Sequence, residues 1–118
     1  MLKNLPFHLM LKPVGARCNM RCDYCFYSAK RLLYPQSSLI MSSKVLERCI
    51  KQMTSAYTSA PITFGWQGGE PTLMGIDFYK QVTRLQKKYA PPHVTIENSL
   101  QTNGILIDED WCRFLSEN

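Results

Sequence analysis

The sequence predicts an α/β fold in which three strands and three helices alternate and the strands form one parallel sheet. Short apolar runs with β-branched residues alternate with longer segments whose apolar residues recur at helical spacing. Each expected strand runs into a loop that contains glycine or polar residues. The length of 118 residues and the hydrophobic content of 45% suit one small domain.

The first strand is expected over residues 7–12, an apolar run that Pro13 and Gly15 end. Ser42 or Ser43 can then cap the first helix, because a serine hydroxyl accepts a hydrogen bond from a free N–H of the first turn. The apolar residues of this helix repeat at helical spacing; they are Val45, Leu46, Cys49, Ile50 and Met53.

The second strand is expected over residues 62–66, which are rich in β-branched and aromatic side chains. It runs into the loop Gln67-Gly68-Gly69-Glu70-Pro71. A second helix is expected over residues 77–89, and Pro91 and Pro92 stop it because proline cannot continue a helix. The apolar face of this helix consists of Phe78, Val82, Leu85 and Tyr89.

The third strand is expected over residues 93–100, where Val94, Ile96, Asn98 and Leu100 occupy alternate positions. It ends in the loop Gln101-Thr102-Asn103-Gly104. Asp108 is expected to cap a third helix, with Glu109 and Asp110 in the first turn, where the helix dipole favours anions. Because the carboxyl ends of parallel strands share one edge, the three loops are expected to meet where α/β and barrel enzymes place their active sites.

Three cysteines in the loop after the first strand are the most informative feature of the chain. Cys18, Cys22 and Cys25 have the spacing C-x3-C-x2-C. Three thiolates within eight residues can hold three corners of a [4Fe-4S] cluster, since such clusters are ligated by cysteine sulfur. The fourth iron then has no protein ligand, and an open metal position is where a small molecule binds and reacts.

Two other interpretations of the cysteines remain open. A structural zinc site needs a fourth ligand, which would have to come from Cys49, Cys112, His8 or His93, and none of these lies in a second paired motif. A disulfide framework is disfavoured by the odd count of five cysteines and by the lack of a leading hydrophobic segment with a cleavage site. Cys49 and Cys112 lie among apolar residues, so core packing is expected for both.

The composition argues against nucleic acid and membrane partners. The net charge is +5 and the pI is near 9.0, but the basic residues are scattered rather than gathered in a stripe with aromatics. No apolar run approaches the ~20 residues that a membrane span needs. With no signal peptide, a cytoplasmic location is expected, where thiols stay reduced and free for iron.

Three parallel strands cannot close a barrel, and parallel sheets need both faces covered. The chain is therefore expected to be the front part of a larger domain. The competing interpretation is a compact three-stranded module that dimerises to cover its open edge.

The motifs quoted above resemble those of the radical S-adenosylmethionine (radical SAM) superfamily, and the cysteine triplet is the strongest of them. Lys12-Pro13, Cys25-Phe26-Tyr27, the run from Phe64 to Leu73 and Gln101-Thr102-Asn103-Gly104 resemble those of the anaerobic sulfatase-maturating branch. The resemblance implies an α/β fold, the N-terminal part of a partial (β/α)6 barrel. Residues 1–118 would then be the N-terminal half of the core domain, without the C-terminal auxiliary-cluster domain.

The resemblance also implies roles for particular residues. Cys18, Cys22 and Cys25 would ligate the cluster, and Tyr24 would lie near the adenine of SAM. Gly68, Gly69 and Glu70 would receive the methionine amino group of SAM. The residues that would face the substrate peptide are Tyr27, Gln67, Gln101 and Asn103. Plain alternatives remain: a simple turn at Gly68-Gly69, a solvated acid at Glu70 and an αL turn at Asn103-Gly104.

The implied activity is reductive cleavage of SAM at the cluster to a 5′-deoxyadenosyl radical, which oxidises a cysteine or serine of a sulfatase to Cα-formylglycine. The implied partners are a sulfatase or other peptide and a reduced flavodoxin or ferredoxin. No residue of this chain is assigned as catalytic, and the chain alone is expected to be inactive. The alternatives are modification of another ribosomal peptide, and a truncated, non-catalytic metal-binding fragment.

Overall fold

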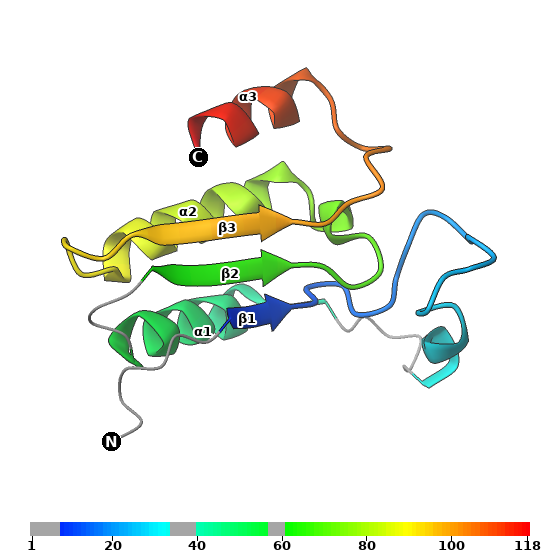
Figure 1. The fold of residues 1–118 in the computed structure, drawn as a ribbon, viewed down its shortest axis with the longest axis horizontal. Coiled ribbons are helices and arrows are strands. Elements are labelled where there is room, and N and C mark those ends of the chain that lie inside the picture. The colour runs from blue at the N-terminus through cyan, green and yellow to red at the C-terminus, as the bar shows by residue number, and fades with distance from the viewer. Residues whose placement is uncertain (1–7, 34–39, 57–60) are drawn as a thin grey trace.

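A computed structural model describes residues 8–33, 40–56 and 61–118. Three strands, β1 (His8–Leu11), β2 (Ile62–Trp66) and β3 (Ile96–Leu100), form one sheet in the order β1-β2-β3 (Figure 1). Both strand pairs are parallel. The expected alternation of strands and helices and the parallel sheet are confirmed. The helices are α1 (Ser43–Ala56), α2 (Ile76–Tyr89) and α3 (Glu109–Glu117), with short 3-10 helices η1 (Ala29–Leu33) and η2 (Pro71–Met74).

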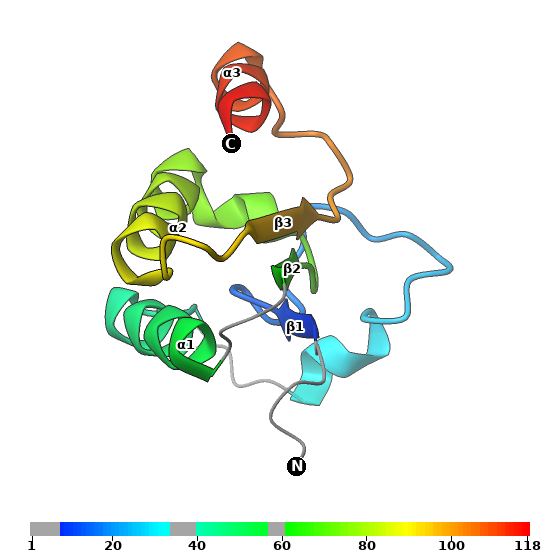
Figure 2. The same ribbon diagram turned by 60° about the vertical axis from the view of Figure 1, so that its left-hand side comes forward.

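Helices α1 and α2 cover one face of the sheet, while the loop after β1 and η1 extend on the other side (Figure 2). The face toward the helices carries the apolar strand residues, because side chains alternate along a strand. Leu11 pairs with Trp66 in the β1–β2 register, and Phe64 pairs with Asn98 in the β2–β3 register. The buried core consists of Leu11, Leu46, Ile50, Met53, Ile62, Phe64, Trp66, Phe78, Tyr79, Val82, Leu85 and Trp111.

Two strands are shorter than expected. The first was expected over residues 7–12 and spans His8–Leu11; position 7 lies outside the described residues. The third begins at Ile96 instead of residue 93. The N–H of Val94 bonds to the carbonyl of Pro91 in a turn, so the segment after the two prolines closes on itself before it joins the sheet. Helix α2 ends at Tyr89, as expected from Pro91 and Pro92, and begins one residue earlier than expected.

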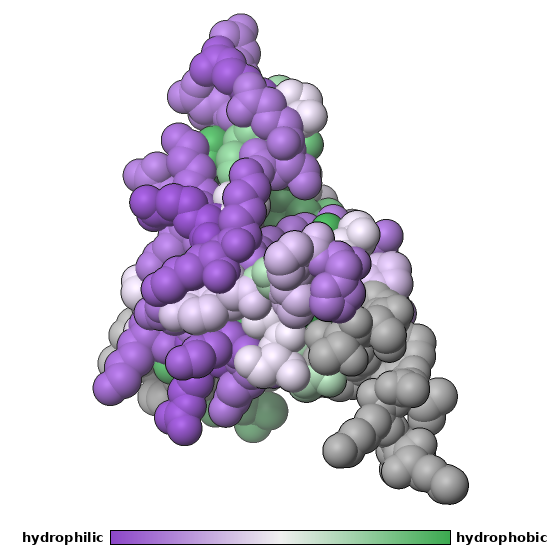
Figure 3. Space-filling view, turned by 90° about the vertical axis from the view of Figure 1, so that its left-hand side faces the viewer, coloured by the Kyte–Doolittle hydropathy of each residue, from purple (hydrophilic) through white to green (hydrophobic). Residues whose placement is uncertain are grey.

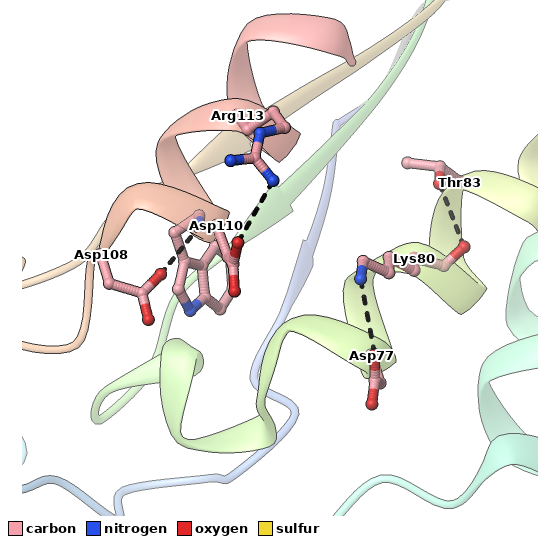
Figure 4. A network of polar contacts seen from close by, with 7 residues as sticks. Asp77, Lys80, Thr83, Asp108, Asp110 and Arg113 are labelled. Atoms are coloured by element: carbon pink, nitrogen blue, oxygen red, sulfur yellow. Dashed lines mark hydrogen bonds and ion pairs between the residues drawn. The ribbon is translucent and has the colours of Figure 1, made fainter.

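The helix caps follow the sequence. Ser42, rather than Ser43, caps α1, because its hydroxyl accepts from the N–H of Val45 at 3.2 Å. Asp108 caps α3 by accepting from the N–H of Trp111 at 2.9 Å (Figure 4). The exposed Asp110–Arg113 ion pair of the same helix is also drawn in Figure 4.

The two cysteines outside the triplet differ in burial. Cys49 is half-buried and packs against the core, as expected. Cys112 is exposed, so its expected place in the core is wrong. The reason is the geometry of a helix: α3 turns Trp111 toward the core, and the next residue projects about 100° away around the axis.

The end of the molecule at which the strands begin is largely hydrophilic (Figure 3). None of the helices in the described part of the chain is long and apolar enough to cross a membrane.

A polar cluster of Trp66, Gln86 and Asn98 lies between the sheet and α2. Oδ1 of Asn98 accepts from Nε1 of Trp66 at 3.0 Å and from Nε2 of Gln86 at 2.9 Å. Nδ2 of Asn98 donates to Oε1 of Gln86 at 2.9 Å. Trp66 and Gln86 are buried, whereas Asn98 is exposed. Because buried polar groups are costly when unpaired, Asn98 satisfies the Trp66 and Gln86 side chains and ties β3 to β2 and α2.

We expect Asn98→Ala to lower the free energy of unfolding by about 1–3 kcal/mol, because it leaves the Trp66 indole N–H and the Gln86 amide without partners. Urea unfolding of the intact protein measures the change. Gln52→Ala, which truncates an exposed amide on α1, is the control and is expected to be neutral. Equal stability of Asn98→Ala and Gln52→Ala would contradict this account.

Candidate functional site

The loops that follow β1, β2 and β3 lie at the same edge of the sheet, where all three strands end (Figure 1). They contain the three cysteines, the Gln67–Pro71 motif and the Gln101–Gly104 motif. The expectation that these motifs share one edge is confirmed.

The cysteine loop joins β1 to η1, and its three thiols are each half-buried. The backbone N–H of Tyr27 donates to the Cys25 sulfur and holds the pKa of that thiol below its usual value, with smaller contributions from Ser28 and Arg31. Burial acts in the opposite direction. A lowered pKa favours the thiolate, which is the form of cysteine that binds metals.

The chemistry of this donor set suits an iron–sulfur cluster, since thiolates are the ligands that hold such clusters. Within residues 8–33, 40–56 and 61–118, no three Cys, His, Asp or Glu side chains converge as a metal site. This holds for the cysteine triplet and equally for a zinc site completed by His8, His93, Cys49 or Cys112.

Arg31, a residue of η1, forms two hydrogen bonds to the backbone of the cysteine loop. Its Nε donates to the carbonyl of Ala16 at 3.2 Å, and its Nη2 donates to the carbonyl of Met20 at 2.9 Å. The two carbonyls lie on either side of Cys18 in the sequence, so one guanidinium fixes the chain before and after the first cysteine. Arg31 was not expected at the site, because nothing near it in the sequence points to a partner 15 positions away.

Gly68 and Gly69 lie directly against the backbone that leads into the cysteine loop. The N–H of Gly69 donates to the carbonyl of Gly15 at 2.7 Å, and the N–H of Glu70 donates to the carbonyl of Arg17 at 2.7 Å. A Cβ at position 69 would overlap the Arg17 carbonyl group, and one at position 68 would come within 2.6 Å of the Gly15 oxygen. Glycine is therefore needed here for the approach of one loop to another within the chain.

Glu70 is 1% exposed, so the alternative of a solvated loop acid is wrong. Its Oε1 accepts from the Thr72 N–H at 3.2 Å, the Thr72 hydroxyl at 2.7 Å and the Thr102 hydroxyl at 2.6 Å. Its Oε2 accepts from the N–H of Asn103 at 2.7 Å. Burial alone would raise the pKa of Glu70, but these donors outweigh it and hold the pKa below its usual value. An ionised carboxylate thus joins the loops after β2 and β3.

Asn103 connects the loop after β3 to the cysteine loop. Its Nδ2 donates to Oδ1 of Asn19 at 2.8 Å and lies 3.8 Å from Sγ of Cys18. Asn103 was expected as a site residue, whereas Asn19 and Thr102 were not. The position of Thr102 inside the Gln-Thr-Asn-Gly motif was the available signal for that residue.

The aromatic and glutamine residues expected to contact SAM or peptide lie around the same edge. Tyr24 is 91% exposed, and a hydrogen bond with Cys22 raises the pKa of its phenol. Tyr27 is half-buried beneath the Lys12 ammonium, which lies 4.8 Å from the ring centroid. Gln67 donates to the sulfur of Met10 at 3.2 Å, and Gln101 is exposed. Their roles toward SAM and peptide stay predictions.

A family model described as the Radical SAM superfamily matches residues 13–118. The chain belongs to the radical SAM superfamily. The matched residues include the cysteine loop and the loops after β2 and β3.

The chain is similar to curated enzymes of one radical SAM branch. It is 43% identical over 114 residues to the serine-type anaerobic sulfatase-maturating enzyme of Bacteroides thetaiotaomicron, covering 96% of this chain and 27% of that enzyme. It is 44% identical over 114 residues to the cysteine-type enzyme of Clostridium perfringens, covering 96% of this chain and 30% of that enzyme. The chain thus spans less than a third of the length of these relatives.

Solved structures give the same result. A structure of native anSMEcpe with bound AdoMet and Cp18Cys peptide has a TM-score of 0.82 and 43% identity to the chain. The match covers 97% of this chain and 29% of that one. A structure of native anSMEcpe with bound AdoMet has a TM-score of 0.84 and 43% identity, with 96% and 31% covered. The expected N-terminal radical SAM fold is confirmed.

We expect Gly69→Ala to destabilise the protein by about 3 kcal/mol or more, because the added methyl group overlaps the Arg17 carbonyl and forces two loops apart. Gly65→Ala is the matched control: its Cβ would meet its nearest neighbour, Ser99, at an ordinary 3.5 Å. Thermal unfolding of the intact protein compares the two variants. A Gly69→Ala protein as stable as Gly65→Ala would show that the loops do not meet as described.

Proposed function

We propose that this chain is the N-terminal part of an anaerobic sulfatase-maturating radical SAM enzyme, with residues 1–118 forming the first half of its core domain. The observation that carries the proposal is the cysteine triplet at the carboxyl edge of a parallel sheet, joined to two further motif loops. The identity of 43–45% to serine- and cysteine-type maturases supports the choice of branch.

In this proposal Cys18, Cys22 and Cys25 hold a [4Fe-4S] cluster, and SAM binds beside it. When bound, the cluster and SAM supply a one-electron reductive cleavage that yields a radical able to remove a hydrogen atom from the peptide. The lowered pKa of Cys25 favours the ligating thiolate. Arg31 fixes the backbone on both sides of Cys18.

The loop after β2 offers SAM mainly its backbone, since the Glu70 carboxylate accepts four hydrogen bonds from the chain itself. Backbone carbonyls at Gly68 and Gly69 would suit an ammonium group such as that of methionine, because a carbonyl oxygen accepts from an N–H. Tyr24 is exposed and available to stack on the adenine. Tyr27, Gln67, Gln101 and Asn103 remain the candidates for contact with the peptide.

The proposed partners are a sulfatase peptide as substrate and a reduced flavodoxin or ferredoxin as electron donor. A cytoplasmic location is part of the same proposal, because the five cysteines are free and a cluster needs reduced thiols. The chain spans less than a third of its curated relatives, so turnover is expected of the intact enzyme and not of these 118 residues alone.

We expect Cys22→Ala to abolish iron binding, since two thiolates cannot hold a cluster in this loop. Anaerobic reconstitution followed by iron analysis measures this. In the parent protein, reduction should give a [4Fe-4S]⁺ electron paramagnetic resonance signal that shifts when SAM is added. Cys112→Ser, which changes an exposed cysteine of α3, is the control and should keep its iron. Unchanged iron and brown colour in Cys22→Ala would refute the cluster assignment, and a zinc-loaded parent would favour the non-catalytic fragment.

We expect the reconstituted intact enzyme to convert a sulfatase peptide to formylglycine in the presence of SAM and a reductant. Mass spectrometry separates the two substrates: serine loses two hydrogens, whereas cysteine loses sulfur and two hydrogens and gains oxygen. Both peptides should be tested, because the identities to the two types of enzyme are nearly equal. SAM cleavage without change of either peptide would favour the alternative of another ribosomal peptide as substrate.

A further inference from the structure

We propose that Asn103 is a positioning residue of the cysteine loop: its side-chain amide, held in place by Glu70, donates to Sγ of Cys18 and raises the reduction potential of the cluster. This inference rests on the proposed function, because it takes Cys18 as a cluster ligand. It gives Asn103 a role beside the cluster, which differs from the expected contact with the substrate peptide.

The hydrogen bonds of the Asn103 side chain fix which end of the amide faces the cysteine. Its Oδ1 accepts from the backbone N–H of Ile105 at 3.1 Å. A backbone N–H can only donate, so this contact identifies the oxygen, and the Nδ2 group must point the other way. There it donates to Oδ1 of Asn19 at 2.8 Å and lies 3.8 Å from Sγ of Cys18.

The position of Asn103 is in turn set by the buried Glu70 carboxylate. The backbone N–H of Asn103 donates to Oε2 of Glu70 at 2.7 Å, and the hydroxyl of the preceding Thr102 donates to Oε1 at 2.6 Å. Glu70 is itself tied to the cysteine loop through its own N–H, which donates to the carbonyl of Arg17. Asn103 therefore meets Cys18 because both loops are anchored to the same residue.

The sulfur of Cys18 is the acceptor of two N–H groups. The backbone N–H of Met20 lies 3.4 Å from Sγ, and Nδ2 of Asn103 is the second donor. Donors to a ligating sulfur stabilise the more electron-rich reduced cluster and so raise its reduction potential. The couple is a one-electron reduction in which the cluster takes an electron from a low-potential reductant, and no bond of the protein forms or breaks.

The first experiment is a redox titration of the reconstituted intact enzyme, followed by electron paramagnetic resonance, with dithionite as the reductant. Asn103→Ala and Asn103→Asp are both expected to lower the midpoint potential. Asn103→Ala removes the donor without adding charge and is the decisive variant. Asp keeps an oxygen for the N–H of Ile105 but has no N–H to give to Cys18, and its negative charge lowers the potential further. Gln52→Ala, which removes an exposed amide on α1, is the control and should keep the parent potential.

Glu70→Gln tests whether Glu70 acts through Asn103. An amide at this position offers one acceptor oxygen to four donors, so the Asn103 backbone is released and the potential should fall. The fall should be smaller than in Asn103→Ala, because the lost Glu70 charge acts in the opposite direction. The double variant Asn103→Ala/Glu70→Gln should fall no further than Asn103→Ala alone. Additive shifts would overturn the positioning role of Glu70, because they would mean that it acts on the cluster by a separate route.

Hydrogen exchange of the iron-free protein gives a readout that does not need the cluster. Faster exchange of residues 18–21 in Asn103→Ala than in Gln52→Ala would support the role of Asn103 in holding the cysteine loop. Equal exchange in the two variants would overturn it. A parent enzyme that holds no cluster overturns the proposed function. A parent enzyme that holds the cluster, with an unchanged midpoint potential in both Asn103 variants, overturns this inference alone.

Discussion

The buried Glu70 carboxylate is the interaction on which the arrangement of the candidate site depends. An ionised carboxylate removed from water is costly unless donors replace the lost hydration. Here four donors come from Thr72, Thr102 and Asn103, and therefore from the loops after two different strands. The loops after β2 and β3 must therefore stay close enough for all four donors to reach the Glu70 carboxylate. An acid within a turn motif thus sets the distance between two strand ends.

The loop after β1 is joined to the same assembly by close approach of backbone to backbone. Gly69 and Glu70 donate to the carbonyls of Gly15 and Arg17, and a side chain on Gly69 would prevent this. Arg31 holds the loop through the carbonyls of Ala16 and Met20. The cysteine loop is therefore positioned by hydrogen bonds to its backbone, while its thiols stay half-buried and accessible to a ligand.

The two faces of the sheet carry different kinds of side chain. The face toward α1 and α2 carries the stacked Phe64 and Trp66 rings and the rest of the apolar core. The other face carries small or polar residues such as Gly65 and Ser99, together with the exposed Met10. Stability is thus concentrated on the helix side, and the chemistry-bearing loops lie at the edge beyond it. This division agrees with a chain that spans less than a third of the relatives it matches.

The sequence by itself determined the order of the elements, the cap at Asp108, a serine cap at position 42 or 43 and the edge at which the motifs meet. These follow from periodicity, turn chemistry and parallel pairing, which act over a few residues or along one strand. Only the tertiary structure decided that Cys112 is exposed, that β3 begins at Ile96 and that Glu70 is saturated by the chain's own donors. Asn103 and Cys18 are 85 positions apart, and contacts at that distance depend on how whole loops approach one another in space.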